Sequence, residues 1–352
     1  MQSNRKFGCG RIAGGNTNDK RILKKMLDGK ELILATRPYA KEDRKKSWLY
    51  TWTTLFLLIG AFIGALYPFH WSIRAAFSLL EALLLARMFV IYHDYLHLAI
   101  LRKSVMANLI FTFFGFYMLT PRSIWKRSHD HHHKHNSKLF TSSIGSFPIV
   151  TKEKFNKMSR KERLNYLFVR HPLTIALGYI FAFTWGMSIL SLVRSPTKHW
   201  DSLLALIFHY GLAVVLYLNF GLAAMLFSLI IPVTIAHGLG SYLFYVQHNF
   251  PEATFEDKEG WTYIGAAMNS TSFLKLSRVM HWFTANIGYH HIHHANSKIP
   301  FYRLPEVFKA FPEFQHPKTS SLMPKDIIKC LQLKVWDPDL GRMLTRSELR
   351  LD

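Results

Sequence analysis

The sequence contains little cysteine: Cys9 and Cys330 are the only two among its 352 residues. One chain with two thiols can build neither a disulfide framework nor a metal site made of several thiolates. An apolar leader is also lacking, because the 47 residues before Trp48 are polar. We therefore expect no N-terminal signal peptide.

Acidic residues are scarce as well. The chain has 22 Asp and Glu against 44 Lys and Arg, a formal net charge of +22. The basic excess lies in residues 1–47, between the apolar blocks and in the C-terminal third. None of it forms a nucleic-acid-binding motif, so we predict no nucleic-acid partner. Basic segments beside apolar blocks are typical of a membrane protein whose basic regions face the cytoplasm and anionic headgroups.

Long apolar blocks set the fold class. The blocks at about 48–68 and 71–92 are each long enough for one membrane crossing, which takes about 20 residues. A third block, Leu203 to Val246, has no Asp, Glu, Lys or Arg and predicts two crossings, at about 203–220 and 222–246. A soluble core rarely contains such a run. We therefore predict an all-α membrane protein with about four transmembrane helices.

Histidine is abundant, with 19 residues, and it recurs at regular spacings. The segment "HDYLH" has two histidines four residues apart, and "HDHHH" and "HHIHH" each have three at positions i, i+3 and i+4. On a helix these spacings put the imidazoles on one face, close enough to share a metal ion. Eight imidazoles exceed what one zinc ion binds, so they predict two metal ions. The ligand type leaves iron, copper, nickel and zinc open.

The surroundings of these clusters favour a redox metal. They flank apolar membrane segments, and no activated serine or cysteine nucleophile is evident, which points to chemistry on a hydrocarbon chain. Unactivated C–H bonds resist acids, bases and nucleophiles, but they yield to oxygen-dependent iron chemistry.

The distribution of positive charge predicts the topology. The basic residues 1–47 stay in the cytoplasm, so the first crossing runs outward and the second returns. The weaker stretches Val105 to Leu119 and Thr174 to Val193 are interpreted as peripheral or re-entrant. A crossing by the first would separate "HDYLH" from "HDHHH", and the second has basic residues at both ends. All three clusters then lie in a cytoplasmic helical cap, and Asn219 to Gly221 form an outer hairpin.

The three clusters resemble the histidine boxes HxxxH, HxxHH and HxxHH of the integral-membrane fatty acid desaturases. The segments "RHPLTI" (170–175), "LFYVQHNF" (243–250) and "HWFTANIGYHHIHHANSKIPFYRLPE" (281–306) look like the acyl-lipid Δ12-type branch. The resemblance implies a di-iron enzyme, with two non-haem iron ions, that uses O₂ and two electrons to form a cis double bond in a fatty acyl chain. It covers residues 48–344, the expected membrane-embedded desaturase domain, and leaves 345–352 as a C-terminal tail.

Carried over box by box, the resemblance implies eight metal ligands: His93, His97, His129, His132, His133, His290, His293 and His294. A ninth ligand is expected outside the boxes, after the last crossing, where "VQHN" supplies His248. His281 is the main alternative for this position, and His237 is a weaker one.

Several other polar residues are candidates for supporting roles. Asp94 and Asp130 are candidates to orient a ligating imidazole through its other nitrogen. Asn136 closes the second box and is a candidate to bind a ligand or the backbone. Glu81 and Arg87 lie inside the second predicted crossing. Charges at membrane depth are often functional. The alternative for Arg87 is extension toward the inner membrane surface, and Glu81 has no evident partner.

The electrons must come from a separate protein, because the chain has no haem-attachment, flavin-binding or iron–sulfur motif. A basic cytoplasmic surface favours an acidic donor, either a ferredoxin or cytochrome b5. The HxxxH form of the first box favours an acyl-lipid (glycerolipid) substrate over acyl-CoA. We expect a bacterial inner membrane, with the endoplasmic reticulum as the alternative.

Alternative functions remain open at this point. A fatty acyl or carotenoid hydroxylase and an alkane monooxygenase share the histidine boxes, and the spacing of the ligands does not distinguish them. A histidine-rich metal transporter or storage protein would instead carry its histidines along the membrane spans. The sequence does not predict the oligomeric state.

Overall fold

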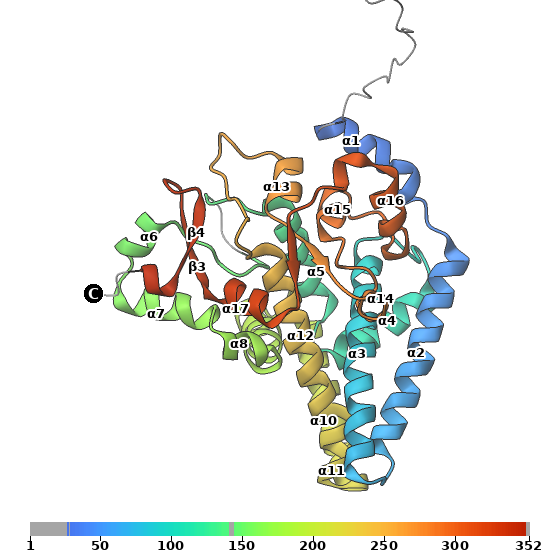
Figure 1. Cartoon of the computed structure of the whole chain (residues 1–352). Helices are drawn as coiled ribbons and strands as arrows, with labels where there is room; N and C mark the ends of the chain where they lie inside the picture. The colour runs from blue at the N-terminus through green and yellow to red at the C-terminus, as the bar shows by residue number, and fades with distance from the viewer. Residues whose placement is uncertain (1–26, 28, 141–143, 350–352) are drawn as a thin grey trace, which may run out of the picture.

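The computed structural model describes residues 27, 29–140 and 144–349. Long helices converge toward one narrow end of the molecule, and a broader cap of short helices and strands covers the other end (Figure 1). Within the described part of the chain, four helices are long and apolar enough to cross a membrane. This confirms the predicted number of crossings.

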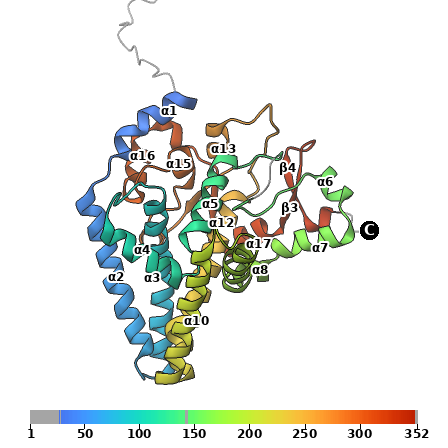
Figure 2. The ribbon, with the colours of Figure 1, turned by 180° about the vertical axis from the view of Figure 1, so that it is seen from behind.

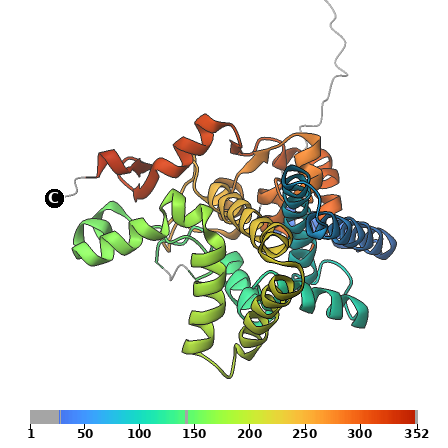
Figure 3. The same ribbon diagram turned by 90° about the horizontal axis from the view of Figure 1, so that it is seen from below.

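The four long helices lie close to the predicted positions. They are α2 (Arg44–Leu66), α3 (Trp71–Leu96), α10 (Trp200–Phe220) and a continuous helix made of α11 (Leu222–Met225), η3 (Leu226–Ile230) and α12 (Ile231–His248). Helix α2 begins before Trp48 because the Asp43 side chain accepts a hydrogen bond from the Lys46 amide and caps the helix there. Seen from the narrow end, α2, α3 and α12 follow one another across the bundle (Figure 3).

Two tight connections lie together at the narrow end (Figure 1). One joins α2 to α3 through residues 67–70. The other joins α10 to α11 at Gly221, whose φ of 83° falls in the left-handed region that favours glycine. The predicted join at Asn219 to Gly221 is therefore confirmed.

Two shorter apolar helices lie beside the bundle. They are α4 (Val105–Tyr117) and the π-helical η2 (Tyr179–Ile189), which continues as α9 (Leu190–Arg194). Both are too short to cross a bilayer at about 20 residues per span, in agreement with their interpretation as peripheral or re-entrant. Each exposes large apolar side chains, including Val105, Phe113 and Trp185.

The cap is built mainly from short helices and 3₁₀ turns. Its helices are α1 (Gly29–Thr36), α5 (Arg122–His135), α6 (Lys152–Lys157), α7 (Arg160–Val169), α8 (Pro172–Ala176), α13 (Tyr263–Asn269), α14 (Arg278–Phe283), α15 (His290–Ala295), α16 (Leu304–Ala310) and α17 (Pro324–Gln332). Its 3₁₀ turns are η1 (Arg37–Ala40), η4 (Phe301–Arg303), η5 (Pro312–Phe314) and η6 (Arg346–Glu348). Part of the predicted N-terminal arm, residues 1–26 and 28, and the end of the tail, residues 350–352, lie outside the described residues.

Two small sheets in the cap were not part of the all-α prediction. Strand β1 (Phe273–Lys275) pairs in parallel with β2 (Thr319–Ser321), and β3 (Leu333–Asp337) pairs antiparallel with β4 (Arg342–Thr345). Strands this short give little alternating signal in the sequence. The helical fold class itself is confirmed.

The main hydrophobic core joins the membrane helices to the cap. Helix α3 is the most buried of the four long helices, and its residues Leu85, Met88 and Tyr92 pack in one cluster with side chains of α4, α10 and α12. Trp125 of α5 belongs to the same cluster. The core therefore fixes the cap ends of α3 and α12 relative to α5.

Glu81 and Arg87, in the middle of α3, are both buried. The hydroxyl of Tyr117 donates to Glu81 Oε1 at 2.9 Å, which supplies the partner that the sequence did not reveal. Of the two alternatives for Arg87, the one in which it extends to the membrane surface is wrong, because the residue is only 2% exposed. Its guanidinium donates to Thr54 Oγ1 and to the Trp282 carbonyl, and it lies 4.1 Å from the centre of the Trp282 ring. These two hydrogen bonds and the cation–π contact stabilise the buried guanidinium of Arg87.

Candidate metal centre

The three histidine boxes meet where the cap contacts the ends of α3 and α12. The first box lies on the last turn of α3 and at its C-cap, the second on α5 and the third on α15. All nine predicted ligands fall into two groups of converging ring nitrogens. The i, i+3, i+4 spacing achieves this because it brings successive imidazoles of one helix to the same face.

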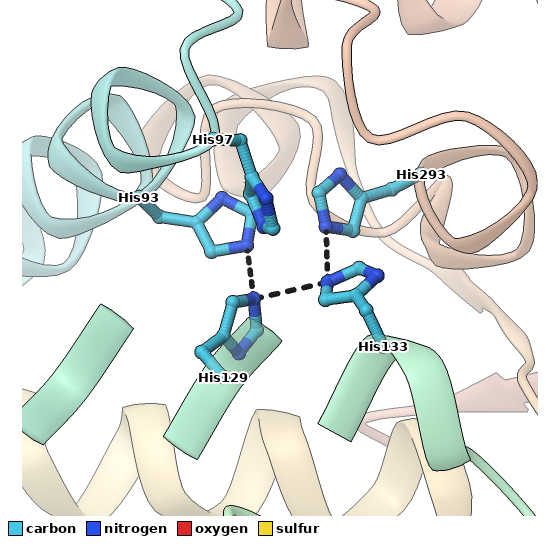
Figure 4. Close-up of side chains that lie close together, drawn as sticks. All are labelled: His93, His97, His129, His133 and His293. Carbon is cyan, nitrogen blue, oxygen red and sulfur yellow. Dashed lines mark hydrogen bonds between the residues drawn. The ribbon is translucent and has the colours of Figure 1, made fainter. Parts of the chain in front are cut away.

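The first group contains five histidines: His93, His97, His129, His133 and His293 (Figure 4). The Nε2 atom of His129 lies 2.9 Å from that of His93 and 3.0 Å from that of His133. The Nε2 atom of His133 also lies 3.1 Å from that of His293.

The second group contains four histidines: His132, His248, His290 and His294. The Nε2 atom of His248 lies 2.9 Å from that of His290 and 3.1 Å from that of His132. The two groups are neighbours, because the rings of His133 and His294 stack with their centres 4.2 Å apart.

Hydrogen bonds alone cannot satisfy these contacts. A neutral imidazole has one N–H donor and one acceptor nitrogen. His133 Nε2 faces both His129 and His293, and His129 Nε2 in turn faces His93, so one proton per nitrogen cannot serve every contact. In addition, the buried Nε2 atoms of His97 and His294 have no hydrogen-bond partner among the described residues. A cation that accepts several lone pairs in each group would satisfy them, so the residues fit two metal ions.

Burial favours the neutral form of the box histidines on the cap helices. Eight of the nine are buried and His248 is partly buried. Burial lowers the pKa well below its usual range, and neighbouring imidazoles lower it further, for the box histidines on the cap helices: His129, His132, His133, His290, His293 and His294. Neutral imidazole is the form that binds metals.

Of the two candidate orienting carboxylates, Asp94 contacts a box histidine and Asp130 does not. Asp94 Oδ1 lies 3.1 Å from His93 Nδ1, and Asp94 Oδ2 accepts from the Phe301 amide at 2.6 Å. Asp130 pairs with Lys126 at 2.6 Å instead, so of the two candidates only Asp94 is placed to orient a box histidine. Asn136 donates to the Ala266 carbonyl, so it binds the backbone.

The two alternatives for the ninth position lie outside both groups. His281 stacks against the rings of Phe273 and Tyr289. His237 faces the carbonyl oxygens of Val233 and Met118 within the membrane part of α12. His248 thus remains the ninth candidate, and its Nδ1 faces the Ser270 carbonyl at 3.3 Å.

An apolar cavity of about 340 Å³ adjoins the histidines. Its walls include Phe89 of α3, Phe183 and Met187 of η2, and Phe244 of α12. It reaches the first group at His93 and His129 and the second at His290. The volume lies in the range of small-molecule sites.

The sequence did not reveal these lining residues. Trp125 is the one that a spacing argument could have found, since it lies one helical turn before His129. Its ring lines the cavity and stacks on the His129 imidazole, with the ring centres 4.4 Å apart.

Comparison with known proteins agrees with this geometry. The "Fatty acid desaturase" family model matches residues 69–322. A "Fatty acid desaturase" of Bacillus subtilis is 28% identical over 313 residues, which cover 88% of this chain and 88% of that protein. An "sn-1 oleoyl-lipid 12-desaturase" of Synechocystis sp. is 24% identical over 281 residues, 77% of this chain and 78% of that protein. An "sn-1 acyl-lipid omega-3 desaturase (ferredoxin)" of Nostoc sp. is 23% identical over 279 residues, 75% and 74% of the two chains.

The family match extends over most of the chain. It includes both histidine groups, with all three histidine boxes, and the full length of three of the four long helices. The chain therefore belongs to the fatty acid desaturase family and is an integral membrane oxidoreductase.

Proposed function

We propose that the protein is an acyl-lipid desaturase that introduces a cis double bond into a fatty acyl chain at a histidine-held pair of iron ions. The observation that carries this proposal is the apolar cavity bounded by imidazoles of both groups. A cavity with aromatic and aliphatic walls suits a hydrocarbon chain. Its contact with both groups would bring that chain to the metals.

The five histidines of the first group would hold one iron ion and the four of the second group the other. Bound iron supplies the O₂-dependent chemistry that removes hydrogen from unactivated carbon. The balanced reaction converts –CH₂–CH₂–, O₂, two electrons and two protons into –CH=CH– and two waters. The cavity walls bind the acyl chain, exclude bulk water and hold two neighbouring carbons beside His93, His129 and His290.

The Δ12 (ω6-like) position and the glycerolipid carrier are proposed from the relatives. The Synechocystis protein is named an oleoyl-lipid 12-desaturase and the Nostoc protein an acyl-lipid omega-3 desaturase. We propose a separate electron donor, ferredoxin or cytochrome b5, and histidine groups on the cytoplasmic face of a bacterial inner membrane. The proposed catalytic domain spans residues 48–344, between the basic N-terminal arm 1–47 and the tail 345–352.

Lipid analysis tests the proposed function. The protein is expressed in a host whose lipids contain only saturated and monounsaturated chains, and the fatty acids are analysed with their double-bond positions. We expect a second double bond at carbon 12 of an oleoyl chain, absent with the His293→Ala variant. A new hydroxyl group would instead indicate a hydroxylase, and unchanged lipids with bound metal would indicate a metal-storage role.

A further inference from the structure

Helix α5 has two faces of different chemistry. Its inner face carries Trp125, His129, His132 and His133, all buried. Its outer face lines an open groove of about 720 Å³, which we call the α5 groove. The groove is lined by Arg122, Ser123, Lys126, Arg127, Asp130, His131, Lys134 and His135 of α5 and by Asp201 of α10. The helix lies on the side of the molecule seen in Figure 2.

The α5 groove has an excess of positive charge. Four of its side chains are basic and two are acidic. Both acidic groups already have partners: Asp130 pairs with Lys126, and both Asp201 oxygens accept hydrogen bonds from Ser123. Arg127 and Lys134 are exposed and have no ion pair among the described residues. Their charges are therefore available to an anionic partner.

A neighbouring lysine strengthens the positive field beside the groove. Lys298 donates to the carbonyl of His97 at 2.6 Å. A negatively charged partner in the groove would be attracted by this additional positive charge. It would also lie next to the backbone of a first-box histidine.

The direction of α5 favours a protein partner over a lipid headgroup. Its first turn is at the membrane side, where Ser123 binds Asp201 at the start of α10. Its last residues reach the cap, where Asn136 binds α13. Because an α-helix rises 1.5 Å per residue, Arg122 and Lys134 lie about 18 Å apart along the axis of α5. A headgroup at the membrane surface would reach only the first turn.

We propose that the α5 groove is the docking site for a small, acidic, soluble one-electron carrier protein. The inference rests on the proposed desaturase function, because that reaction consumes two electrons and the chain has no redox cofactor motif of its own. Each of two successive reduced carriers gives up one electron and leaves oxidised, and both electrons end in the water formed from O₂. A carrier in the groove is separated from the histidines of α5 by about one helix diameter, 10–12 Å.

Charge reversal in the groove tests the proposal. The probe is a reduced [2Fe–2S] ferredoxin of strongly negative net charge, used with the metal-loaded, full-length protein in bilayers of zwitterionic lipid. For Arg127→Glu combined with Lys134→Glu, we expect the Kd and KM for ferredoxin to rise about tenfold or more. We also expect the ferredoxin-driven rate to fall relative to the rate of the same variant with a small uncharged reductant. The dependence of KM on salt should weaken, because fewer charges steer the encounter.

Two further variants keep the test interpretable. Arg127→Lys with Lys134→Arg retains both charges and should bind ferredoxin as the unaltered protein does. Lys325→Glu with Lys329→Glu makes the same charge change on α17, which packs on α12, β2 and β3, and should leave ferredoxin binding and turnover unchanged. Bound metal and thermal unfolding are measured for each variant to verify the fold.

The possible outcomes separate the two proposals. Unchanged ferredoxin binding in the α5 variant, or an equal loss in the α17 variant, overturns the docking site. An α5 variant that loses only a response to added anionic lipid also overturns it, in favour of a headgroup site. If ferredoxin binds in a groove-dependent manner but no reductant yields a double bond, the docking site stands and the desaturase function fails.

Discussion

At the residue scale, two outer contacts determine which nitrogen of an imidazole faces the metal groups. The Asp94 carboxylate and the Ser270 carbonyl can only accept hydrogen bonds, so the N–H groups of His93 and His248 lie on Nδ1. Each ring then directs the lone pair of Nε2 into its group. One such anchored histidine lies in each group.

Asp94 offers a direct test of this anchoring. It also accepts the Phe301 amide, which ties the end of α3 to the segment that follows the third box. We expect Asp94→Asn to weaken metal binding by about 10-fold to 100-fold, because outer partners of ligating histidines have effects of that size. The measurement is competition for metal against a chelator. Asp130→Asn is the matched control, and equal affinities of the two variants would refute the role of Asp94.

The ninth candidate can be tested in the same way. His248 contacts two other histidines of the second group, whereas His281 contacts the rings of Phe273 and Tyr289. We expect His248→Ala to lose about half of the bound metal, because the second group would retain only three imidazoles. His281→Ala should keep all of it. Metal analysis of purified protein decides between them, and a loss confined to His281→Ala would reverse the assignment.

At the element scale, α12 links the cavity to the second histidine group. Its cavity-lining residues run from Ala236 to Gln247, one residue before His248. Ala236 and His237 are the lining residues of α12 farthest from His248 in the sequence, so they mark the end of the cavity that lies deepest along this helix. In the proposed function, this end would set the length available to an acyl chain.

A larger side chain at this end should shorten the cavity. Ala236 lines the cavity and is only 3% exposed. We therefore expect the larger ring of Ala236→Phe to occupy part of the cavity. We expect kcat/KM for the longest acyl chains to fall about tenfold, with a smaller loss for shorter chains and unchanged metal content. We also expect this overpacking to lower the free energy of unfolding by about 1–3 kcal/mol. Ile235→Phe, on the neighbouring exposed position of the same turn, is the control. An equal loss for all chain lengths would contradict a length-setting role.

Local patterns account for the parts of the structure that the sequence predicts well. Long hydrophobic runs with few charges are local, so they predict the crossings to within a few residues. The i, i+3, i+4 spacing is local too, and it predicts which imidazoles of one helix lie together. The meeting of the three boxes followed only from the family resemblance and the common membrane face.

Long-range contacts explain what the sequence did not predict. The carbonyl that binds Arg87 belongs to Trp282, far along the chain, so no local pattern could show that this cation stays buried. The cavity likewise combines side chains of α3, α5, η2 and α12. Phe89, Phe183 and Phe244 look like ordinary core residues in the sequence, and only packing makes them walls of a cavity.

At the scale of the whole molecule, the helices separate two ends. The turns at residues 67–70 and at Gly221 lie at the narrow end, and α5, α13 and α15 lie in the cap (Figure 1). Four crossings require both turns to be on one side of the membrane and the cap on the other. Positive charge should keep the cap in the cytoplasm, which would make the histidine groups accessible to a soluble electron donor there.

Cysteine labelling in spheroplasts tests this orientation. Asn219, beside the α10–α11 turn, and Lys258, in the cap, are both exposed and are replaced singly by cysteine in a Cys9→Ser background. The remaining Cys330 is 1% exposed and should react little. We expect a membrane-impermeant maleimide to label Asn219→Cys in intact spheroplasts and Lys258→Cys only after permeabilisation. Labelling of both from outside would contradict the four-crossing topology, and the reverse pattern would put the histidine groups outside, beyond the reach of a cytoplasmic donor.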